Sequence, residues 1–184
     1  MYDFCMSQLP MFPLFVDPVR EGVIGPSEVA CGICGLQRGC IYTGPQYGSS
    51  DRMTICPWCI ADGSACDRGI ALNDATIYPL LPSTPQMTIE DRRMVEGLTP
   101  GFTTWQGNRW LMCCGRACVY LGEAESADLR GRWHGVIPSM FQDSGFGAAE
   151  MEEIVDRVMK GGSPCAYVFQ CQVCQSLHGY WDCH

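Results

Sequence analysis

The chain has 184 residues, 47% of them apolar, which is enough for one domain or for two small ones. Its formal net charge of −8 opposes binding to a phosphate backbone, so we do not expect nucleic acid as a partner. No apolar run approaches the roughly 20 residues that a membrane-spanning helix needs, so we expect no membrane insertion.

Cysteine is the residue type that most constrains the interpretation, because the chain contains 14 of them. Such a number is typical either of a secreted disulfide scaffold or of an intracellular metal protein. The segment that starts at Met1 is not a basic stretch followed by an apolar run, which a secretory signal peptide requires. The cysteines also occur in close pairs with the spacing of metal ligands. We therefore expect a reduced protein in the cytoplasm.

The first 30 residues are interrupted by prolines and lack helical periodicity. Pro10 and Pro13 alternate with Phe12 and Phe15, a pattern that predicts an extended arm packing its aromatic rings on the domain. A short strand is expected next, around residues 39–42.

The first set of cysteines predicts a zinc site. Cys31 and Cys34 form one C-x-x-C pair, and Cys56 and Cys59 form another after 21 intervening residues. Two such pairs at this separation are typical of a tetrahedral four-sulfur zinc site. Pro57 suits the first position of a helix because it has no N–H group to lose. A turn with one pair, a hairpin, and a helix start with the second pair is the order of a treble-clef zinc site.

The middle of the chain offers weaker signals. Strand pieces are expected within residues 75–81, and a short helix over residues 88–96. Thr88 with Asp91 three residues later resembles a capping box, and Gly97 would stop the helix.

The last third of the chain mixes helix and strand signals. The spacing over residues 114–121 predicts a helix, and residues 131–147 read as a glycine-rich connection. The clearest helix covers residues 150–160, where apolar residues form one stripe. A strand over residues 166–169 then leads into the last cysteine pair.

A second set of cysteines predicts another four-sulfur site. Cys114 and Cys118 form a looser C-x-x-x-C pair, and Cys171 and Cys174 form a C-x-x-C pair 52 residues later. The adjacent Cys113 leaves open which sulfur of this region points inward. His178, four residues after Cys174, is an alternative ligand.

The two C-x-x-C pairs nearest the chain ends share a short pattern. Cys34 is followed five residues later by Gly39, and Cys174 is followed at the same offset by Gly179. Each pair therefore resembles a metal-binding turn followed by a strand.

A four-thiolate zinc site has no open coordination position, so it holds structure and does not catalyse. The sequence has only three histidines and lacks the common phosphate-loop, zinc-protease and serine-hydrolase motifs, so we do not expect an enzyme. Asp182, Cys183 and His184 could suggest a catalytic cluster, but residues this close in sequence rarely point at one centre. Thiol–disulfide exchange by a C-x-x-C pair is the alternative chemistry.

Several motifs resemble those of the CbrC-type family of bacterial proteins, which is associated with tolerance to a colicin. They are Leu9-Pro10-x-Phe12, Asp17-Pro18, Cys31-x2-Cys34-Gly35, Tyr42-Thr43-Gly44-Pro45, Cys56-Pro57-Trp58-Cys59-Ile60-Ala61-Asp62-Gly63-Ser64-Ala65, Thr99-Pro100-Gly101-Phe102, Trp105-Gln106, Cys114-Gly115-x2-Cys118 and Gly179-Tyr180-Trp181-Asp182. The resemblance covers nearly the whole chain and implies the same four cysteine pairs. It leaves out Cys5, Cys40, Cys66, Cys113, Cys165 and Cys183.

Together these patterns predict a small α+β protein with treble-clef or zinc-knuckle elements, short strands and a few short helices. We expect one domain over residues 1–184, with possible halves at 1–100 and 101–184, each built around one structural Zn²⁺. The resemblance and the acidic charge favour a non-enzymatic protein that confers tolerance or immunity by binding a protein partner, such as a basic toxin domain. A thiol-redox or other enzyme in an envelope or stress response, and a structural adaptor, are the alternatives. The sequence leaves the oligomeric state open.

Overall fold

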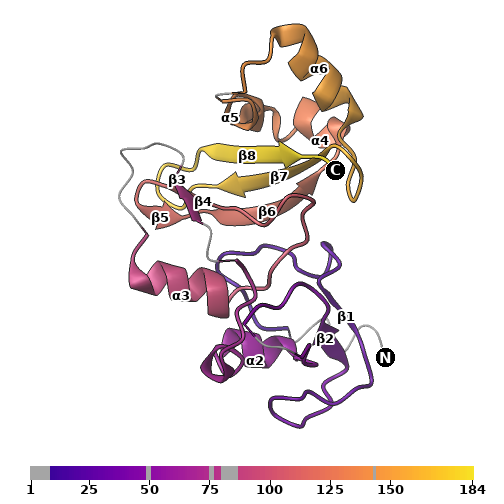
Figure 1. Ribbon diagram of the computed structural model, residues 1–184, viewed down its shortest axis with the longest axis vertical. Helices are drawn as coiled ribbons and strands as arrows, with labels where there is room; N and C mark the ends of the chain where they lie inside the picture. Colours follow the sequence, from indigo (N-terminus) through magenta and orange to yellow (C-terminus); the bar gives the residue numbers. More distant parts are fainter. Residues whose placement is uncertain (1–8, 49–50, 75–76, 80–86, 143) are drawn as a thin grey trace. The chain divides into compact units, whose positions relative to one another are not determined.

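The computed structural model describes residues 9–48, 51–74, 77–79, 87–142 and 144–184. It has the predicted α+β class, with short strands and short helices (Figure 1). The chain divides into two compact units: residues 1–76 with 88–103, and residues 77–87 with 104–184. That the chain acts as one domain over residues 1–184 stays a prediction.

The first unit follows the predicted order of turn, hairpin and helix. Strand β1 (Ile24–Pro26) pairs antiparallel with β2 (Cys40–Tyr42). The chain then returns alongside β2, where the Tyr42 N–H donates to the Ile55 carbonyl over 2.8 Å. Helix α2 (Pro57–Ala61) follows at once, with Pro57 in its first turn as predicted, and a short 3₁₀ turn η1 (Cys66–Arg68) comes after it.

Aromatic and aliphatic side chains of the N-terminal arm form part of the first unit's core. Phe12, Leu14 and Phe15 are only 7%, 3% and 1% exposed. Burial of these side chains stabilises an arm that has no regular structure of its own between residue 9 and β1. The predicted packing of the aromatic rings is therefore confirmed for the part of the arm that the structure describes, but the arm folds into turns, such as that closed by the Phe15 N–H on the Phe12 carbonyl, and is not extended.

Helix α3 (Ile89–Gly97) completes the first unit and begins as predicted. Its N-cap Thr88 accepts the backbone N–H of Asp91 at 3.0 Å. The C-terminal end is held by the buried Asn73, whose amide donates to the carbonyls of Val95 and Thr99 at 2.7 and 3.0 Å. These bonds fix the end of the helix together with the burial of Val95.

The second unit contains two small sheets. In the first, β3 (Ile77–Pro79) runs parallel to β4 (Trp110–Cys113), and β4 pairs antiparallel with β5 (Arg116–Ala117). In the second, β7 (Cys165–Gln170) lies between β6 (Val119–Ala124) and β8 (Leu177–Asp182), all antiparallel. Strand β3 falls within the expected segment 75–81, of which residues 75–76 and 80–81 lie outside the described residues.

The helix predicted over residues 114–121 is wrong, because these residues form β5 and the start of β6. Burial along β6 alternates residue by residue, which is the period of a strand and not of a helix. The expected connection over residues 131–147 also contains a 3₁₀ turn η2 (His134–Val136) and helix α5 (Ile137–Met140). Pro138 lies in the first turn of α5, so a proline there starts a helix and does not interrupt one.

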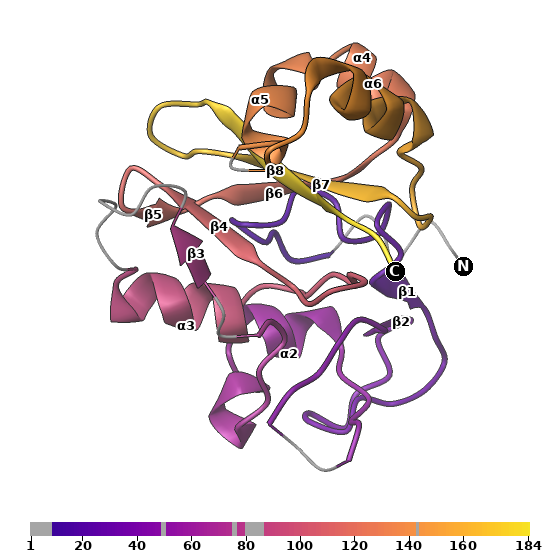
Figure 2. The ribbon, with the colours of Figure 1, turned by 45° about the horizontal axis from the view of Figure 1, so that its top comes forward.

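Helices cover one face of the β6–β7–β8 sheet (Figures 1 and 2). They are α4 (Ser126–Arg130), η2, α5 and α6 (Ala148–Arg157). Leu129, Val136 and Val155 from these helices form one core cluster with Ala166 and Val168 of β7. Helix α6 overlaps the predicted residues 150–160 but begins and ends earlier, and beyond it the Met159 N–H donates to the Pro164 carbonyl at 3.2 Å.

The opposite face of the same sheet is aromatic. Trp110 of β4 packs its ring 5.7 Å from Phe169 of β7 and 6.4 Å from Tyr120 of β6. Its indole N–H donates to the carbonyl of Cys118 at 2.9 Å. This packing fixes β4 against β6 and β7, and so it positions Cys113 at the end of β4.

No helix among the described residues is long and apolar enough to cross a membrane.

Candidate metal centres

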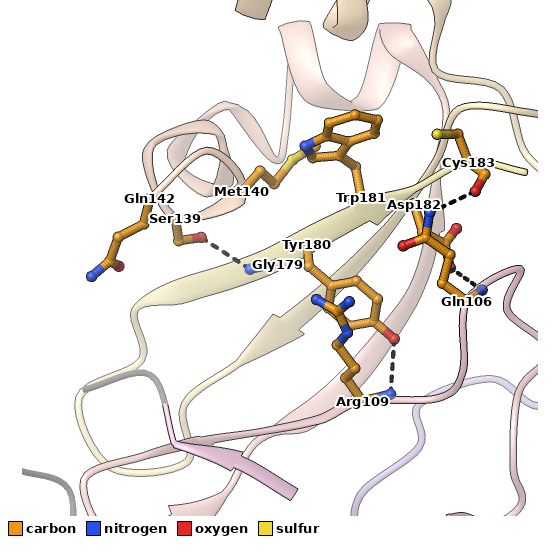
Figure 3. Close-up of a pocket in the computed structure, with 10 residues that line it drawn as sticks. All are labelled: Gln106, Arg109, Ser139, Met140, Gln142, Gly179, Tyr180, Trp181, Asp182 and Cys183. Atoms are coloured by element: carbon orange, nitrogen blue, oxygen red, sulfur yellow. Dashed lines mark hydrogen bonds between the residues drawn. The ribbon is translucent and has the colours of Figure 1, made fainter. Parts of the chain in front are cut away.

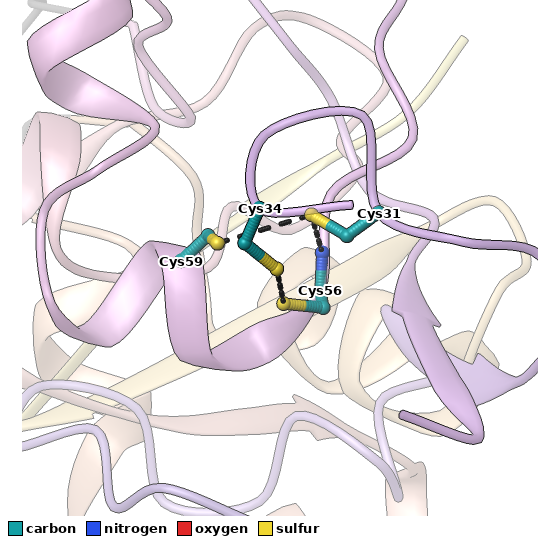
Figure 4. A group of neighbouring side chains, drawn as sticks. All are labelled: Cys31, Cys34, Cys56 and Cys59. Carbon is teal, nitrogen blue, oxygen red and sulfur yellow. Dashed lines mark hydrogen bonds between the residues drawn. The ribbon is translucent and has the colours of Figure 1, made fainter. Parts of the chain in front are cut away.

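The first predicted set of cysteines comes together as one group. Cys31, Cys34, Cys56 and Cys59 place their four sulfurs within 4.8 Å of one another (Figure 4). The Cys31–Cys59 and Cys34–Cys56 sulfur distances are 3.8 and 3.9 Å. A tetrahedral ion with Zn–S bonds near 2.3 Å requires sulfurs about 3.8 Å apart. The group therefore has the dimensions of a four-thiolate metal site.

A tight turn between β1 and β2 holds Cys31 and Cys34. The Cys31 N–H donates to Leu36 O at 3.0 Å, and the Gly35 N–H donates to Cys31 O at 2.8 Å. Gly35 has a positive φ of 72°, which glycine adopts without strain. The Ile33 N–H points at the Cys31 sulfur at 3.4 Å, an interaction that favours the thiolate form of Cys31.

The start of α2 supplies the other two sulfurs of this group. Cys56 is the N-cap and Cys59 lies in the first turn, so the helix orients both side chains. The Cys56 N–H also donates to the Cys31 sulfur at 3.3 Å. Cys31, Cys56 and Cys59 are 2%, 1% and 2% exposed, while Cys34 is exposed.

The second group comprises Cys113, Cys114, Cys171 and Cys174, again within 4.8 Å of one another. The Cys113 sulfur lies 3.8 Å from that of Cys114 and 3.7 Å from that of Cys174, so these distances also fit a tetrahedral four-sulfur site. Three of the four predicted residues are therefore brought together, and Cys118 is not among them.

The hairpin between β4 and β5 explains why Cys113 takes the place predicted for Cys118. Cys113 pairs with Arg116 across a two-residue turn, in which Cys114 and Gly115 have positive φ of 52° and 76°. This turn type suits an X-Gly loop, so the Cys114-Gly115 dipeptide was the signal that a helical interpretation missed. Cys118 lies beyond the hairpin, where its N–H donates to Leu111 O at 2.9 Å and its side chain is fully buried.

The turn that carries Cys171 and Cys174 repeats the turn of the first group. The Cys171 N–H donates to Ser176 O at 2.9 Å, and the Gln175 N–H donates to Cys171 O at 3.2 Å. The Val173 N–H points at the Cys171 sulfur at 3.3 Å. These three bonds have the same offsets as those that start from Cys31, and Gln175 has a positive φ of 60° where Gly35 stands. The predicted similarity between the two turns is confirmed.

The electrostatics of both groups favour a bound cation. Burial raises the pKa of the Cys31 thiol, but backbone N–H groups outweigh it and lower the pKa to about 7. The Ser176 hydroxyl lowers the pKa of Cys174 to about 6. Burial, followed by hydrogen bonds with neighbouring sulfurs, raises the pKa of Cys59 and of Cys113. Closely spaced thiolates repel one another, and a bound cation would offset that repulsion.

His178 lies next to the second group and is not one of its four members. The Cys174 sulfur is 2.9 Å from the Ser176 hydroxyl oxygen, which is 2.7 Å from His178 Nε2. Ser176 therefore stands between the imidazole and the sulfur. This arrangement gives His178 a supporting position behind a candidate ligand, in contrast to the alternative that it is a ligand itself.

A cavity of about 380 Å³ lies along β8 in the second unit (Figure 3). The Arg109 guanidinium lies 5.5 Å above the ring of Tyr180, and the Gly179 N–H donates to the Ser139 hydroxyl at 3.0 Å. Among the residues that line the cavity are Gln106, Gln142, Trp181, Asp182 and Cys183. Its walls combine amide, hydroxyl and charged groups with two aromatic rings.

Asp182 and His184, near the end of the chain, both contact the segment at residues 105–106. Asp182 Oδ2 accepts the N–H groups of Trp105 and Gln106 at 3.1 and 3.2 Å. The ring of His184 packs edge-on against Trp105, with centroids 4.7 Å apart. Asp182 thus serves to anchor the segment at residues 105–106, which supports the structural interpretation of these terminal residues over a catalytic one with Cys183.

The fold and its two groups define a class: an α+β protein with two four-cysteine clusters that could hold metal ions. Residues 9–183 match the uncharacterised protein family UPF0167, and the chain belongs to that family.

Two relatives illustrate how much of the chain the family covers. UPF0167 protein PA1536 of Pseudomonas aeruginosa is 36% identical over 172 residues, which cover 92% of this chain and 94% of the relative. UPF0167 protein Mb2317 of Mycobacterium bovis is 37% identical over 181 residues, covering 96% and 94%. No solved structure matches the chain.

Substitution of Cys113 and of Cys118 separates the two possible ligand sets. Cys113→Ala removes a sulfur from the second group and should lower the metal content by one ion per chain. Cys118→Ala removes a buried sulfur outside that group and should leave the metal content unchanged. Elemental mass spectrometry of both variants, purified without chelator, measures this, with Cys66→Ala as the control. Loss of an ion from Cys118→Ala alone would show that the ligand set is the one the sequence suggested.

Proposed function

We propose that each cysteine group binds one Zn²⁺ and that both ions serve a structural role in a non-enzymatic protein. The observation that carries this proposal is the approach of the sulfurs: two pairs lie 3.8 and 3.9 Å apart in the first group and 3.8 and 3.7 Å apart in the second, close to the edge of a zinc–thiolate tetrahedron, and all four lie within 4.8 Å in each group. The repeated turn with N–H groups aimed at a sulfur supports it. Four thiolates would fill the coordination shell, so bound zinc would supply cross-linking and no catalytic position.

The first ion would connect the loop between β1 and β2 to the start of α2. Besides the sulfurs, the Gly32 N–H joins the two segments by donating to the Thr54 carbonyl at 2.7 Å, but β1 and β2 have only three residues each and α2 has five. Elements this short are marginal on their own. Zinc bound to four thiolates contributes roughly 10–16 kcal/mol at neutral pH, comparable to the whole stability of a small domain.

The second ion would connect the turn between β4 and β5 to the turn between β7 and β8. Here the aromatic packing of Trp110 on Phe169 and Tyr120 already joins the two sheets. The helices on the other face add an apolar core around Leu129 and Val136. The second unit therefore depends less on its ion than the first unit does.

Removal of zinc should consequently affect the two units unequally. Incubation with a strong chelator should unfold the first unit, since its short elements lose their common anchor, while the β6–β7–β8 sheet persists. Hydrogen–deuterium exchange measures this by segment: amides of β2 and α2 should lose protection, and amides of β7 should retain most of theirs. Zinc should restore the lost protection. Unchanged protection of α2 after complete removal of metal would contradict the structural role.

We further infer that the protein binds a basic protein partner in the cytoplasm and thereby confers tolerance to an antibacterial toxin. The net charge of −8 supports this inference, because it attracts a basic domain such as a nuclease. Helix α6 presents four exposed acidic residues, Glu150, Glu152, Glu153 and Asp156. The resemblance to the CbrC-type family, which is associated with tolerance to a colicin, indicates that the partner is a protein toxin. The eight cysteines of the two groups are free thiols, and thiols stay reduced in a reducing compartment such as the cytoplasm.

A survival assay tests this role. A colicin-sensitive bacterial strain that expresses the protein should survive at least one of a panel of purified nuclease colicins, with viable counts raised by about tenfold or more over the empty vector. A Cys56→Ser variant, which loses a ligand of the first group, is the control for a requirement of the folded protein. Equal survival with and without the protein across the panel, at matched expression, would rule out tolerance to these toxins.

A further inference from the structure

The two cysteine groups differ in how much of each is open to solvent. In the first group Cys31, Cys56 and Cys59 are buried and only Cys34 is exposed. In the second group only Cys171 is buried, Cys113 is partly exposed, and Cys114 and Cys174 are exposed. A dissolved oxidant must reach a sulfur to react with it, so the second group is the accessible one.

The second group also contains a pair of sulfurs, from segments distant in the chain, that lie close enough to join. The sulfurs of Cys113 and Cys174 are 3.7 Å apart and come from segments 61 residues apart in the chain. Cys113 and Cys114 are also close in space, at 3.8 Å, but they are neighbours in the sequence. Adjacent Cα atoms lie about 3.8 Å apart, below the usual range of roughly 4.4–6.8 Å for a disulfide. The geometry therefore favours a bond between Cys113 and Cys174.

A bond between these two residues would preserve the local fold. It would join the turn after β4 to the turn after β7, which are the same two turns that a bound ion would connect. Trp110 and Phe169 hold the two sheets together independently of the cysteines, with their ring centroids 5.7 Å apart. From their separation of 3.7 Å, the Cys113 and Cys174 sulfurs need to approach by less than 2 Å to reach the disulfide bond length of about 2.05 Å.

We propose that the second group is a reversible oxidation site, in which hydrogen peroxide converts Cys113 and Cys174 to a disulfide and releases the zinc ion. This inference rests on the proposed zinc binding. The Cys174 thiolate attacks a peroxide oxygen, breaks the O–O bond, and becomes a sulfenic acid with release of hydroxide. The Cys113 thiolate then attacks the Cys174 sulfur and expels a second hydroxide. Two electrons pass from the sulfurs to peroxide, and zinc leaves as Zn²⁺ without changing its oxidation state.

The first group serves as an internal reference for this reaction. Cys34 is open to an oxidant, but its near neighbour Cys56 is 1% exposed and lies at the start of α2, where its N–H donates to the Cys31 sulfur. Cys31 and Cys59 are buried as well. Loss of the first ion should therefore require opening of the first unit, and it should be slower than loss of the second ion.

Zinc release from the full-length protein under hydrogen peroxide tests the proposal. The zinc content before oxidation is measured first, and fewer than two ions per chain would refute the proposed zinc binding itself. From protein that holds two ions, a chromogenic chelator should report release of one ion at least about tenfold faster than the other. Mass spectrometry after alkylation should then show a Cys113–Cys174 disulfide, and dithiothreitol with zinc should restore both the thiols and the ion.

A Cys66→Ser variant is the matched control, because Cys66 is a free, partly exposed cysteine outside both groups. It should release zinc at the rate of the unaltered protein. Two ions released at the same rate, one ion released without a disulfide, or a disulfide within the first group would each overturn the proposed oxidation site while leaving zinc binding intact.

Discussion

The mutual repulsion of closely spaced thiolates is the constraint on which the structure depends. Each unit brings four sulfurs within 4.8 Å of one another, and in each group the pKa of one thiol is lowered (Cys31, Cys174) while that of a neighbour is raised (Cys59, Cys113). Further ionisation at such distances raises the free energy of the folded state unless a cation is present. A bound divalent ion, as proposed for both groups, would convert that repulsion into attraction. Short strands and short helices can then persist around it.

The two cysteine groups share one structural element and differ in the other. The shared element is a turn in which backbone hydrogen bonds of Cys31 or Cys171 close the loop. In each turn a backbone N–H group points at the sulfur of that same cysteine. The other two sulfurs come from the start of a helix in the first unit and from a hairpin in the second. The helix buries its sulfurs, whereas the hairpin leaves Cys114 at the surface. On the proposed account, this difference in exposure would separate an ion that holds the fold from one that can be released by an oxidant.

The sequence predicted the first centre fully and the second in part, for a physical reason. The C-x-x-C spacing constrains the chain locally, so Cys31, Cys34, Cys171 and Cys174 could be placed in turns without knowledge of the tertiary fold. Cys56-Pro57 likewise marks a helix start. The region from Cys113 to Cys118 offers three sulfurs within six residues, and only the strand pairing of Cys113 with Arg116 decides among them. Pairing partners distant in the sequence, such as Trp110 with Phe169, leave no local signal. Helix α5 was missed because prolines and glycines around it resemble those of a loop.

Membership of the UPF0167 family places these features in a wider group without assigning them an activity. Both groups are proposed to bind zinc through four sulfurs. X-ray absorption spectroscopy at the zinc edge tests this proposal most directly, on full-length protein purified without chelator. The account predicts a single shell of four sulfur atoms at about 2.3 Å for both ions. Nitrogen or oxygen atoms in that shell, or an average of fewer than four sulfurs per ion, would contradict it.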